Sequence, residues 1–247
     1  TVSDWSSDVC SSDLAEPNNT FAEADTMSQG VVKTGHIEYN GGTVEDEYDY
    51  YQTILPENGT LRIFLNSVNT SNSGGADLYF YGYNKSGGPL LINKAYPNVG
   101  VGTVIEDTLY LHCQAADTFY FRIHADGCFS YSFSYDMVQP IYSNDTEPND
   151  VFGTSTEITP EDTVQGHVSY KGGNVTDDYD YYYYLMPANG SVKVNLEAAN
   201  GHSGAAHFYF YPYTNSSGGP TSPKSYFSIP KDSTEKDNFT VSCLSTD

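Results

Sequence analysis

Two acidic phrases in this chain have the residue types and spacing to bind a metal ion. Glu16-Pro17-Asn18-Asn19 is followed about 30 residues later by Asp46-Glu47-Tyr48-Asp49, so an oxygen-rich turn precedes an oxygen-rich strand. Ca²⁺ takes about six to eight oxygen ligands from carboxylates, side-chain amides and main-chain carbonyls. Both phrases return later in the chain. The candidate calcium ligands are Glu16, Asn18, Asn19, Asp46 and Asp49 in the first copy and Glu147, Asn149, Asp150, Asp177, Asp178 and Asp180 in the second.

The alternative interpretation is that neither acidic phrase binds a metal. Asn18 could instead cap the turn that follows it as an Asx-type turn, with the carboxylates solvated. The first copy has Asn19 where the second has Asp150, so it carries less negative charge. Asn18 also begins an Asn-x-Ser/Thr sequon, and a glycan there would compete with a metal. We therefore expect calcium in the second copy more than in the first.

The constant spacing of the phrases shows that the chain is a tandem duplication (147 − 16 = 131 and 180 − 49 = 131). Two domains fit a chain of 247 residues. We predict the first repeat over 15–136, a linker over 137–145 and the second repeat over 146–247.

Both ends of the sequence depart from the repeat. Residues 1–14 hold the only Trp and resemble a translated sequencing adapter, so we interpret them as an assembly artefact; a leader or linker is the alternative. Val241–Asp247 matches Leu111–Asp117, after which the first repeat continues with two further strands. We therefore expect the second repeat to lack its last strands. Truncation is one interpretation, and strands supplied by a neighbouring chain are the other.

Short alternating segments predict an all-β fold. Leu61, Ile63 and Leu65 alternate with polar residues, and further strands fit 103–113, 118–124 and 129–135. Turn residues separate these segments, and no segment has a sustained helical period. The pattern predicts two tandem antiparallel β-sandwich domains.

Composition favours an extracellular protein. The formal charge of −22, from 10 basic and 32 acidic residues, excludes nucleic acid as a partner. No apolar run is long enough for a membrane span. We predict an extracellular or cell-surface location from nine glycosylation sequons. They begin at Asn18, Asn58, Asn69, Asn84, Asn144, Asn174, Asn189, Asn215 and Asn238.

The order of these motifs resembles the bacterial pre-peptidase C-terminal domain. The Glu-Pro-Asn opening, the Asp-x-x-Asp-Tyr-Tyr strand, the Pro-x-Asn-Gly turn and the closing strand 118–123 carry the resemblance. That family is related to the collagen-binding domains of clostridial collagenases, and this chain looks most like versions on secreted Bacteroidetes proteins. The resemblance implies a jelly-roll-like sandwich that serves as a non-catalytic module for adhesion, substrate contact or secretion. Some relatives bind calcium at the acidic opening.

Cysteines and tyrosines supply two further predictions. Cys113 ends one strand and Cys128 begins a later one, so we predict a disulfide between them, with buried free thiols as the alternative. Tyrosines alternate with core residues in two matching strands. A row of this kind could stack on sugars or pack on another protein, or it could only stabilise its sheet. The candidate binding residues are Tyr79, Tyr81, Tyr83, Tyr209, Tyr211 and Tyr213.

No catalytic motif is present, so we predict that the chain is not an enzyme and has no catalytic residues. The six His are scattered, and the carboxylates are too numerous for any pair to stand out. The leading hypothesis is a secreted structural or adhesive module, such as a subunit of a glycosylated repeat protein or filament. Its partners would be other protein domains, copies of itself or extracellular glycan. The alternative is an auxiliary domain that binds polysaccharide or protein for a secreted hydrolase.

Overall fold

The computed structural model describes residues 18–37, 47–71, 75–172, 176–201, 206–210 and 224–243. Several residues singled out above lie outside these ranges. They are the artefact segment 1–14, the candidate ligands Glu16 and Asp46, the sequons Asn174 and Asn215, and the tyrosines Tyr211 and Tyr213.

The chain divides into two compact units. Unit 1 comprises Thr1–Gln139 with Tyr170–Thr176, and unit 2 comprises Pro140–Ser169 with Asp177–Asp247. The strands of unit 1 are β1 (Asp25–Thr26), β2 (Lys33–Ile37), β3 (Tyr48–Ile54), β4 (Gly59–Asn69), β5 (Ala76–Tyr83), β6 (Leu90–Val99), β7 (Val104–Gln114), β8 (Thr118–Ala125), β9 (Phe129–Val138) and β11 (Tyr170–Lys171). β12 (Thr176–Asp177) falls where the units divide. Unit 2 contains the 3₁₀ turn η1 (Phe152–Thr154), β10 (Thr156–Glu157), β13 (Tyr182–Tyr183), β14 (Gly190–Asn200), β15 (Ala206–Phe210), β16 (Lys224–Ile229) and β17 (Ser233–Cys243).

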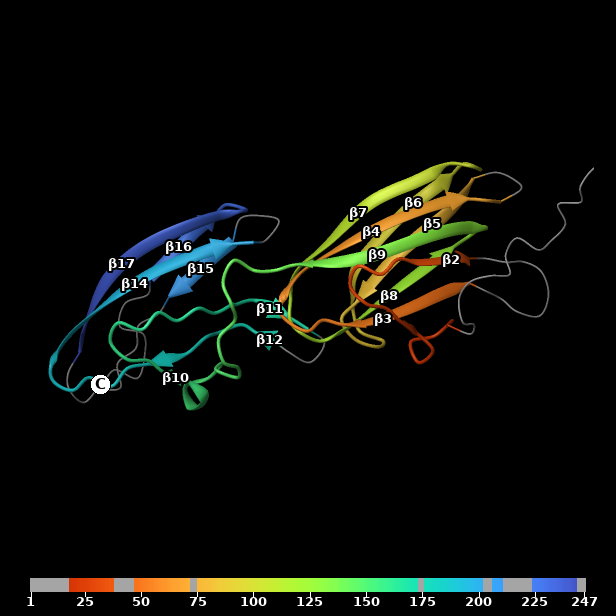
Figure 1. The fold of residues 1–247 in the computed structure, drawn as a ribbon. Helices are drawn as coiled ribbons and strands as arrows, with labels where there is room; N and C mark the ends of the chain where they lie inside the picture. The colour runs from red at the N-terminus through yellow and green to blue at the C-terminus, as the bar shows by residue number, and fades with distance from the viewer. Residues whose placement is uncertain are drawn as a thin grey trace, which may run out of the picture. The chain divides into compact units, whose positions relative to one another are not determined.

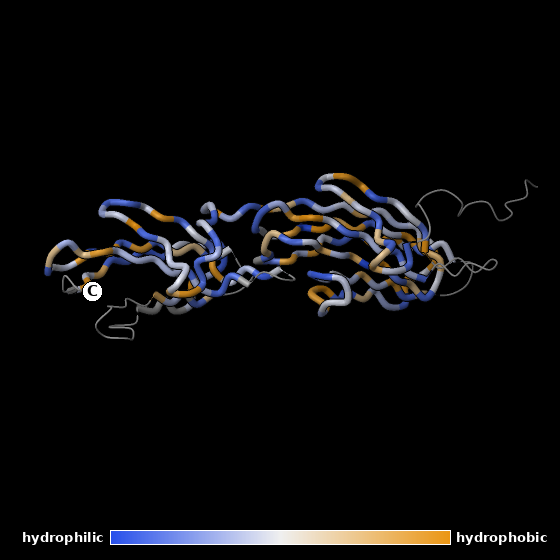
Figure 2. The backbone as a smooth tube through the Cα atoms, turned by 90° about the horizontal axis from the view of Figure 1, so that it is seen from below, coloured by the Kyte–Doolittle hydropathy of each residue, from blue (hydrophilic) through white to orange (hydrophobic). Residues whose placement is uncertain are grey.

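Unit 1 is a sandwich of two sheets (Figure 1). One sheet has the order β1-β3-β8-β5-β6 and the other the order β12-β11-β7-β4-β9-β2. The long ladders are antiparallel, while the short strand β1 runs parallel to β3. Hydrophobic and hydrophilic residues alternate along the strands (Figure 2), as expected for strands with one buried face. The predicted all-β sandwich class is confirmed.

Aromatic rings join the two sheets of unit 1. Phe133 on β9 is 1% exposed, and its ring centroid lies 4.7 Å from that of Tyr51 on β3 and 5.8 Å from that of Phe80 on β5. Leu61 and Ile63 are fully buried on β4. The inward residues of β4 and β9 therefore pack on those of β3, β5 and β8. The apolar residues that alternate with polar ones along these strands thus form the hydrophobic core between the two sheets.

The described residues of unit 2 form three two-stranded sheets. β10 pairs with β13, β14 with β17 and β15 with β16. One local hydrogen bond occurs at the matching place within each unit. Asn69 Nδ2 donates to the carbonyl of Val99 at 2.6 Å in unit 1, and Asn200 Nδ2 donates to the carbonyl of Ile229 at 2.7 Å in unit 2. The duplication in sequence is therefore a duplication of backbone turns as well.

β6 was not among the predicted strands. It is the edge strand of its sheet, and its residues are mostly exposed on both faces, so no alternation marks it in the sequence. None of the helical residues in the described ranges forms a segment long and apolar enough to cross a membrane.

The predicted disulfide between Cys113 and Cys128 is incompatible with the strand register. Gln114 pairs with Gly59 at one end of β4, while Phe129 pairs with Asn69 at the other. Ten residues of a strand span roughly 33 Å, whereas bridged cysteines have Cα atoms within about 7 Å. The loop between the two cysteines is short, but it contains β8, which carries the chain to the far end of the sandwich.

The asparagines of the sequons differ in their exposure to solvent. Asn18 and Asn69 are fully buried, and Asn84, at 9% exposure, donates through Nδ2 to the carbonyl of Gly172 at 3.1 Å. A glycan on such an amide nitrogen would have to displace its neighbours. Glycosylation therefore stays a prediction mainly for the half-buried or exposed sites, which are Asn58, Asn144, Asn189 and Asn238.

Candidate functional site

The acidic turn of unit 2 is fastened to the strand that follows the second acidic phrase. The amide of Tyr181 donates to the carbonyl of Asn149 at 3.1 Å, and Glu147 Oε2 accepts from the amide of Asn149 at 2.9 Å. β10 then runs parallel to β13, with Thr156 opposite Tyr182. These contacts bring the two acidic phrases of unit 2 together, which a calcium site shared by both phrases requires.

Three carboxylates of unit 2 form a compact cluster. Oxygens of Asp145, Glu147 and Asp180 all lie within 4.8 Å of one another. Asp145 Oδ2 accepts hydrogen bonds from Asn149 Nδ2 and from the hydroxyl of Tyr182. Those donors fix the Asp145 carboxylate and leave its second oxygen available to a ligand.

Several oxygens of this cluster are buried without a hydrogen-bond donor in the described part of the chain. They are Asp145 Oδ1, Asn149 Oδ1, Asp180 Oδ1 and both carboxylate oxygens of Asp177. Buried oxygens of this kind are costly unless something satisfies them. Asp145 and Asp180 belong to the compact cluster, so a single cation there could satisfy their buried oxygens.

Gly166 allows the backbone to approach the cluster closely. A Cβ at this position would lie 2.6 Å from Asp180 Oδ2, 3.0 Å from the Tyr182 hydroxyl and 3.1 Å from Asp145 Oδ1. Any side chain here would enter the space around the carboxylates, so glycine is required for close packing.

Burial and the crowding of negative charges raise the pKa values of the carboxyl groups in and beside the cluster. Burial, followed by the charges of neighbouring carboxylates, raises the pKa of Asp177 to about 7 and that of Asp180 to about 8. Burial also raises the pKa of Glu147. Each carboxylate is harder to ionise because the others are near, and a divalent cation would relieve that repulsion.

The cluster matches the donor preference of calcium. Among the residues that the structure describes, the cluster offers carboxylate oxygens and no sulfur or imidazole ligand, which suits a hard cation such as Ca²⁺. Two predicted ligands, Glu147 and Asp180, belong to it. Asn149 donates to Asp145, and Asp177 lies close enough for the charge of Glu147, after burial, to raise its pKa.

The remaining predicted ligands contribute less directly, and one member was missed. The charge of Asp150 raises the pKa of Asp177 and Asp180, while Asp178 is exposed. Sequence reasoning assigned Asp145 to the linker. The available signal was an acidic residue two positions before Glu147, which the first repeat does not match because Leu14 stands there.

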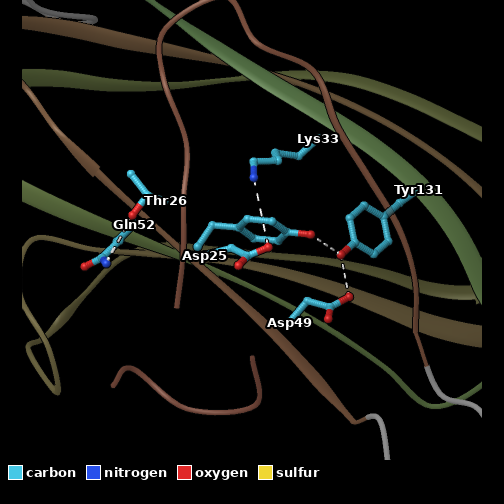
Figure 3. A network of polar contacts seen from close by, with 7 residues as sticks. Asp25, Thr26, Lys33, Asp49, Gln52 and Tyr131 are labelled. Carbon is cyan, nitrogen blue, oxygen red and sulfur yellow. Dashed lines mark hydrogen bonds and ion pairs between the residues drawn. The ribbon is translucent and has the colours of Figure 1, made fainter. Parts of the chain in front are cut away.

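In unit 1 the corresponding aspartate is held by tyrosines. Asp49 is fully buried and accepts a hydrogen bond from the hydroxyl of Tyr131, which lies 2.6 Å from that of Tyr51 (Figure 3). The carbonyl of Asn18 accepts from the amide of Tyr50 at 3.0 Å, as its counterpart does in unit 2. Asn19 is half-buried beside them. A tyrosine hydroxyl thus donates to a carboxylate in each unit, to Asp49 in unit 1 and to Asp145 in unit 2.

An aromatic face covers the outer side of β3, β8 and β5 in unit 1. The guanidinium carbon of Arg122 lies 4.2 Å from the ring centroid of Tyr81, 5.3 Å from that of Tyr48 and 5.8 Å from that of Tyr83. Tyr79 and Tyr81 are half-buried and stack at 6.2 Å. Sequence reasoning predicted the tyrosine row but gave no role to Arg122, because only cross-strand pairing places the rings around it.

The predicted binding tyrosines differ in their exposure to solvent. Tyr83 is 7% exposed and its ring lies 5.1 Å from that of Phe21. Tyr209 of unit 2 is 49% exposed. Contact with a sugar or protein therefore stays a prediction for Tyr79, Tyr81 and Tyr209, while Tyr83 serves the sheet.

Replacing Arg122 with Ala is expected to lower the free energy of unfolding of unit 1 by about 2 kcal/mol. The cation–π contacts of a partly desolvated guanidinium account for this magnitude. Arg122→Lys keeps a cation but loses the planar stacking, so its loss should be smaller. Urea unfolding of both variants measures the difference, and equal stability of wild type and Arg122→Ala would contradict a structural role for the ring cage.

Comparison with solved structures gives weak similarities. The pre-peptidase C-terminal domain of a collagenase from Bacillus anthracis is 16% identical, over 46% of this chain and 95% of that domain, with a TM-score of 0.31. An isomalto-dextranase from Arthrobacter globiformis T6, complexed with panose, is 13% identical over 44% of this chain and 21% of that enzyme (TM-score 0.28). A carbohydrate-binding module of Cellvibrio mixtus lichenase 5A, in complex with cellotriose, is 19% identical over 47% of this chain and 93% of that module (TM-score 0.28). No protein-family model and no curated protein matches the chain. A pre-peptidase C-terminal domain is thus among the similar structures, and membership of that family stays a prediction.

Proposed function

We propose that this chain is a non-catalytic, secreted module with a structural or adhesive role, and that a calcium ion fastens the acidic turn of unit 2 to its strand. The observation that supports the proposal is the compact carboxylate cluster of Asp145, Glu147 and Asp180, in which Asp145 Oδ1 and Asp180 Oδ1 are buried without a donor among the described residues. Such a module would form part of a glycosylated repeat protein or filament outside the cell.

The cluster suits a stabilising ion better than a reaction centre. Asp145 is already fixed by Asn149 and Tyr182, and Gly166 fills the space beside it with backbone. Bound calcium would neutralise the carboxylates and hold residues 145–149 against β13. The turn of unit 1 is fastened to its strand by the corresponding backbone bond, from the amide of Tyr50 to the carbonyl of Asn18, and a tyrosine hydroxyl donates to Asp49. A fixed turn at the start of each repeat would serve a protein that bears load or presents a surface.

Calcium titration of the full chain by isothermal calorimetry tests this proposal. We expect one site that Asp180→Asn weakens by at least about tenfold, because the substitution removes a charged ligand. At 100 times its dissociation constant the ion would stabilise unit 2 by about 2.7 kcal/mol. Asp232→Asn is the matched control, since Asp232 lies in an exposed turn of the same unit. Wild-type protein with no calcium heat and no change of midpoint in EGTA would refute the calcium part of the proposal.

The alternative is an auxiliary domain that binds polysaccharide or protein for a secreted hydrolase. The aromatic face around Arg122 favours it, because stacked tyrosine rings can contact sugar faces. A soluble-glycan binding assay in which Tyr81→Ala abolishes binding would favour the alternative over the structural role.

A further inference from the structure

Three neighbouring strands of unit 1 bring a phenylalanine and several short polar side chains together on one outer face. β4 pairs with β7 on one side and with β9 on the other (Figure 1). Two successive rows of outward residues cross these three strands in register. They are Thr108, Phe64 and Ser134 in one row and Glu106, Asn66 and Ser132 in the next. Phe64 thus stands among side chains shorter than itself, and it is 38% exposed.

The two rows line an open groove with a volume of about 410 Å³. Val32, in the segment that leads into β2, also lines it and is 59% exposed. Small-molecule sites in proteins have volumes of about 300–1,000 Å³. The groove therefore has the size of a small-ligand site. It belongs to the sheet of β4, and the tyrosine face around Arg122 belongs to the other sheet.

The ring of Phe64 has a supported side and a side that meets the groove. The guanidinium carbon of Arg62 lies over the ring, 5.1 Å from its centroid. Arg62 is itself held by Asp136, with Nε donating to Oδ1 at 2.9 Å. The lining of the groove includes Asn66, the next outward residue of β4 on the other side of Phe64, and does not include Arg62. The face of the ring opposite Arg62 is therefore the one that a ligand in the groove would contact.

The polar groups of the groove suit a neutral ligand that carries hydroxyl groups. Side-chain amides and hydroxyls can both donate and accept hydrogen bonds, whereas a carboxylate only accepts. Asn66 Nδ2 donates to Glu106 Oε1 at 3.4 Å, a long bond that leaves the other oxygens of both side chains for a ligand. Asp107 is paired with Lys94 at 3.3 Å, while Glu106 has no ion pair within the described residues. Glu106 would therefore repel an anion and accept hydrogen bonds from hydroxyl groups.

A sugar ring combines the two properties that the groove calls for. The C–H groups on one face of a pyranose pack on an aromatic ring, and the hydroxyls around its edge form hydrogen bonds. A protein partner fits less well, because a stable interface buries about 800 Å² on each side around an apolar core. The exposed apolar side chains described in the groove are those of Phe64 and Val32. The formal charge of −22 disfavours a polyanion.

We propose that this groove binds a neutral oligosaccharide, with Phe64 as the ring that stacks on the sugar and Asn66 and Glu106 as hydrogen-bonding groups for its hydroxyls. The site is separate from the tyrosine face to which the alternative function assigns sugar contact. It lies in unit 1 and needs no calcium, so it is compatible with a structural module and with an auxiliary domain.

Affinity gel electrophoresis of the full chain in EGTA tests the proposal. The probes are a mixed-linkage β-glucan, a xyloglucan and a galactomannan, with polygalacturonate as the anionic comparison. We expect at least one neutral polysaccharide to retard the protein. Phe64→Ala should raise the dissociation constant at least about tenfold, because the stacking ring is lost. Phe64→Tyr keeps a ring and should keep binding, and Asn66→Ala should weaken binding roughly threefold to tenfold.

Tyr110→Ala is the matched control. Tyr110 is 51% exposed on the same face of β7, but it does not line the groove, so its loss should leave retardation unchanged. Thermal unfolding of each variant shows that it is folded at the temperature of the assay. No retardation by any neutral probe, retardation by polygalacturonate alone, or equal losses in Phe64→Ala and Tyr110→Ala would overturn the proposal. Binding that survives Phe64→Ala and disappears in Tyr81→Ala would also overturn it, and would assign the sugar to the tyrosine face instead.

Discussion

In the absence of calcium, the unfolding midpoint of unit 2 is expected to fall by roughly 5 °C or more between about pH 5 and pH 9, a change that corresponds to about 1 kcal/mol in a domain of this size. Burial, followed by neighbouring negative charge, raises the pKa of Asp180 to about 8 and that of Asp177 to about 7. In the unfolded chain both carboxyls return to a pKa near about 3.9. The folded unit therefore holds protons that the unfolded chain has released. This stabilisation is complete below about pH 4 and is lost as the pH rises through the folded pKa values.

Calcium should reverse this dependence, because metal ligands must be deprotonated and the ion then compensates their charge. Calorimetry of the full chain in EGTA and in calcium, at about pH 5, 7 and 9, measures both effects. Asp180→Asn should remove much of the pH dependence in EGTA and identify which transition belongs to unit 2. Asp232→Asn should leave it intact. A midpoint that does not change with pH in EGTA would contradict the buried, mutually repelling carboxylates.

Replacing Phe133 with Ala is expected to lower the free energy of unfolding of unit 1 by about 3–5 kcal/mol, the range for truncating a fully buried phenylalanine. Phe133 is 1% exposed and its ring meets Tyr51 at 4.7 Å and Phe121 at 5.9 Å, so it contacts strands of the opposite sheet. Its loss would leave a cavity between the two sheets that the rigid ladders on either side cannot close.

Phe64 provides the control for this substitution. It lies on the outer face of β4 at 38% exposure, under the guanidinium of Arg62. Phe64→Ala should cost less than Phe133→Ala, because Phe64 lies on the outer face and is already 38% exposed, so its truncation removes less buried apolar area. Guanidinium chloride unfolding of both variants gives the comparison. Equal losses for the two would mean that Phe133 is not part of a continuous core.

The acidic turn makes the same local contacts in both units. Phe21 meets Tyr50 and Phe152 meets Tyr181, each with ring centroids 4.7 Å apart. The turns therefore dock on their strands through the same backbone bond and the same aromatic pair. In unit 1 Tyr131 donates to the aspartate, and in unit 2 we propose that calcium neutralises its counterpart Asp180.

The sequence by itself determined the repeat, the all-β class and the membership of most of the acidic cluster. These features depend on local patterns: alternation along Leu61, Ile63 and Leu65 specifies a strand, and the repeated phrases specify a repeated turn. Glu147 and Asp180 were both named as candidate ligands because oxygen-rich phrases of this kind suit calcium.

Only the tertiary structure decided which residues meet across strands. Register is set by the packing of whole faces, so the sequence could not show that β8 separates Cys113 from Cys128 by the length of β4. The same cross-strand pairing surrounds Arg122 with tyrosine rings and directs Tyr131 to Asp49. Asp145 belongs to the cluster because its carboxylate accepts a hydrogen bond from the hydroxyl of Tyr182. These residues are 37 positions apart, so no local sequence pattern encodes the contact.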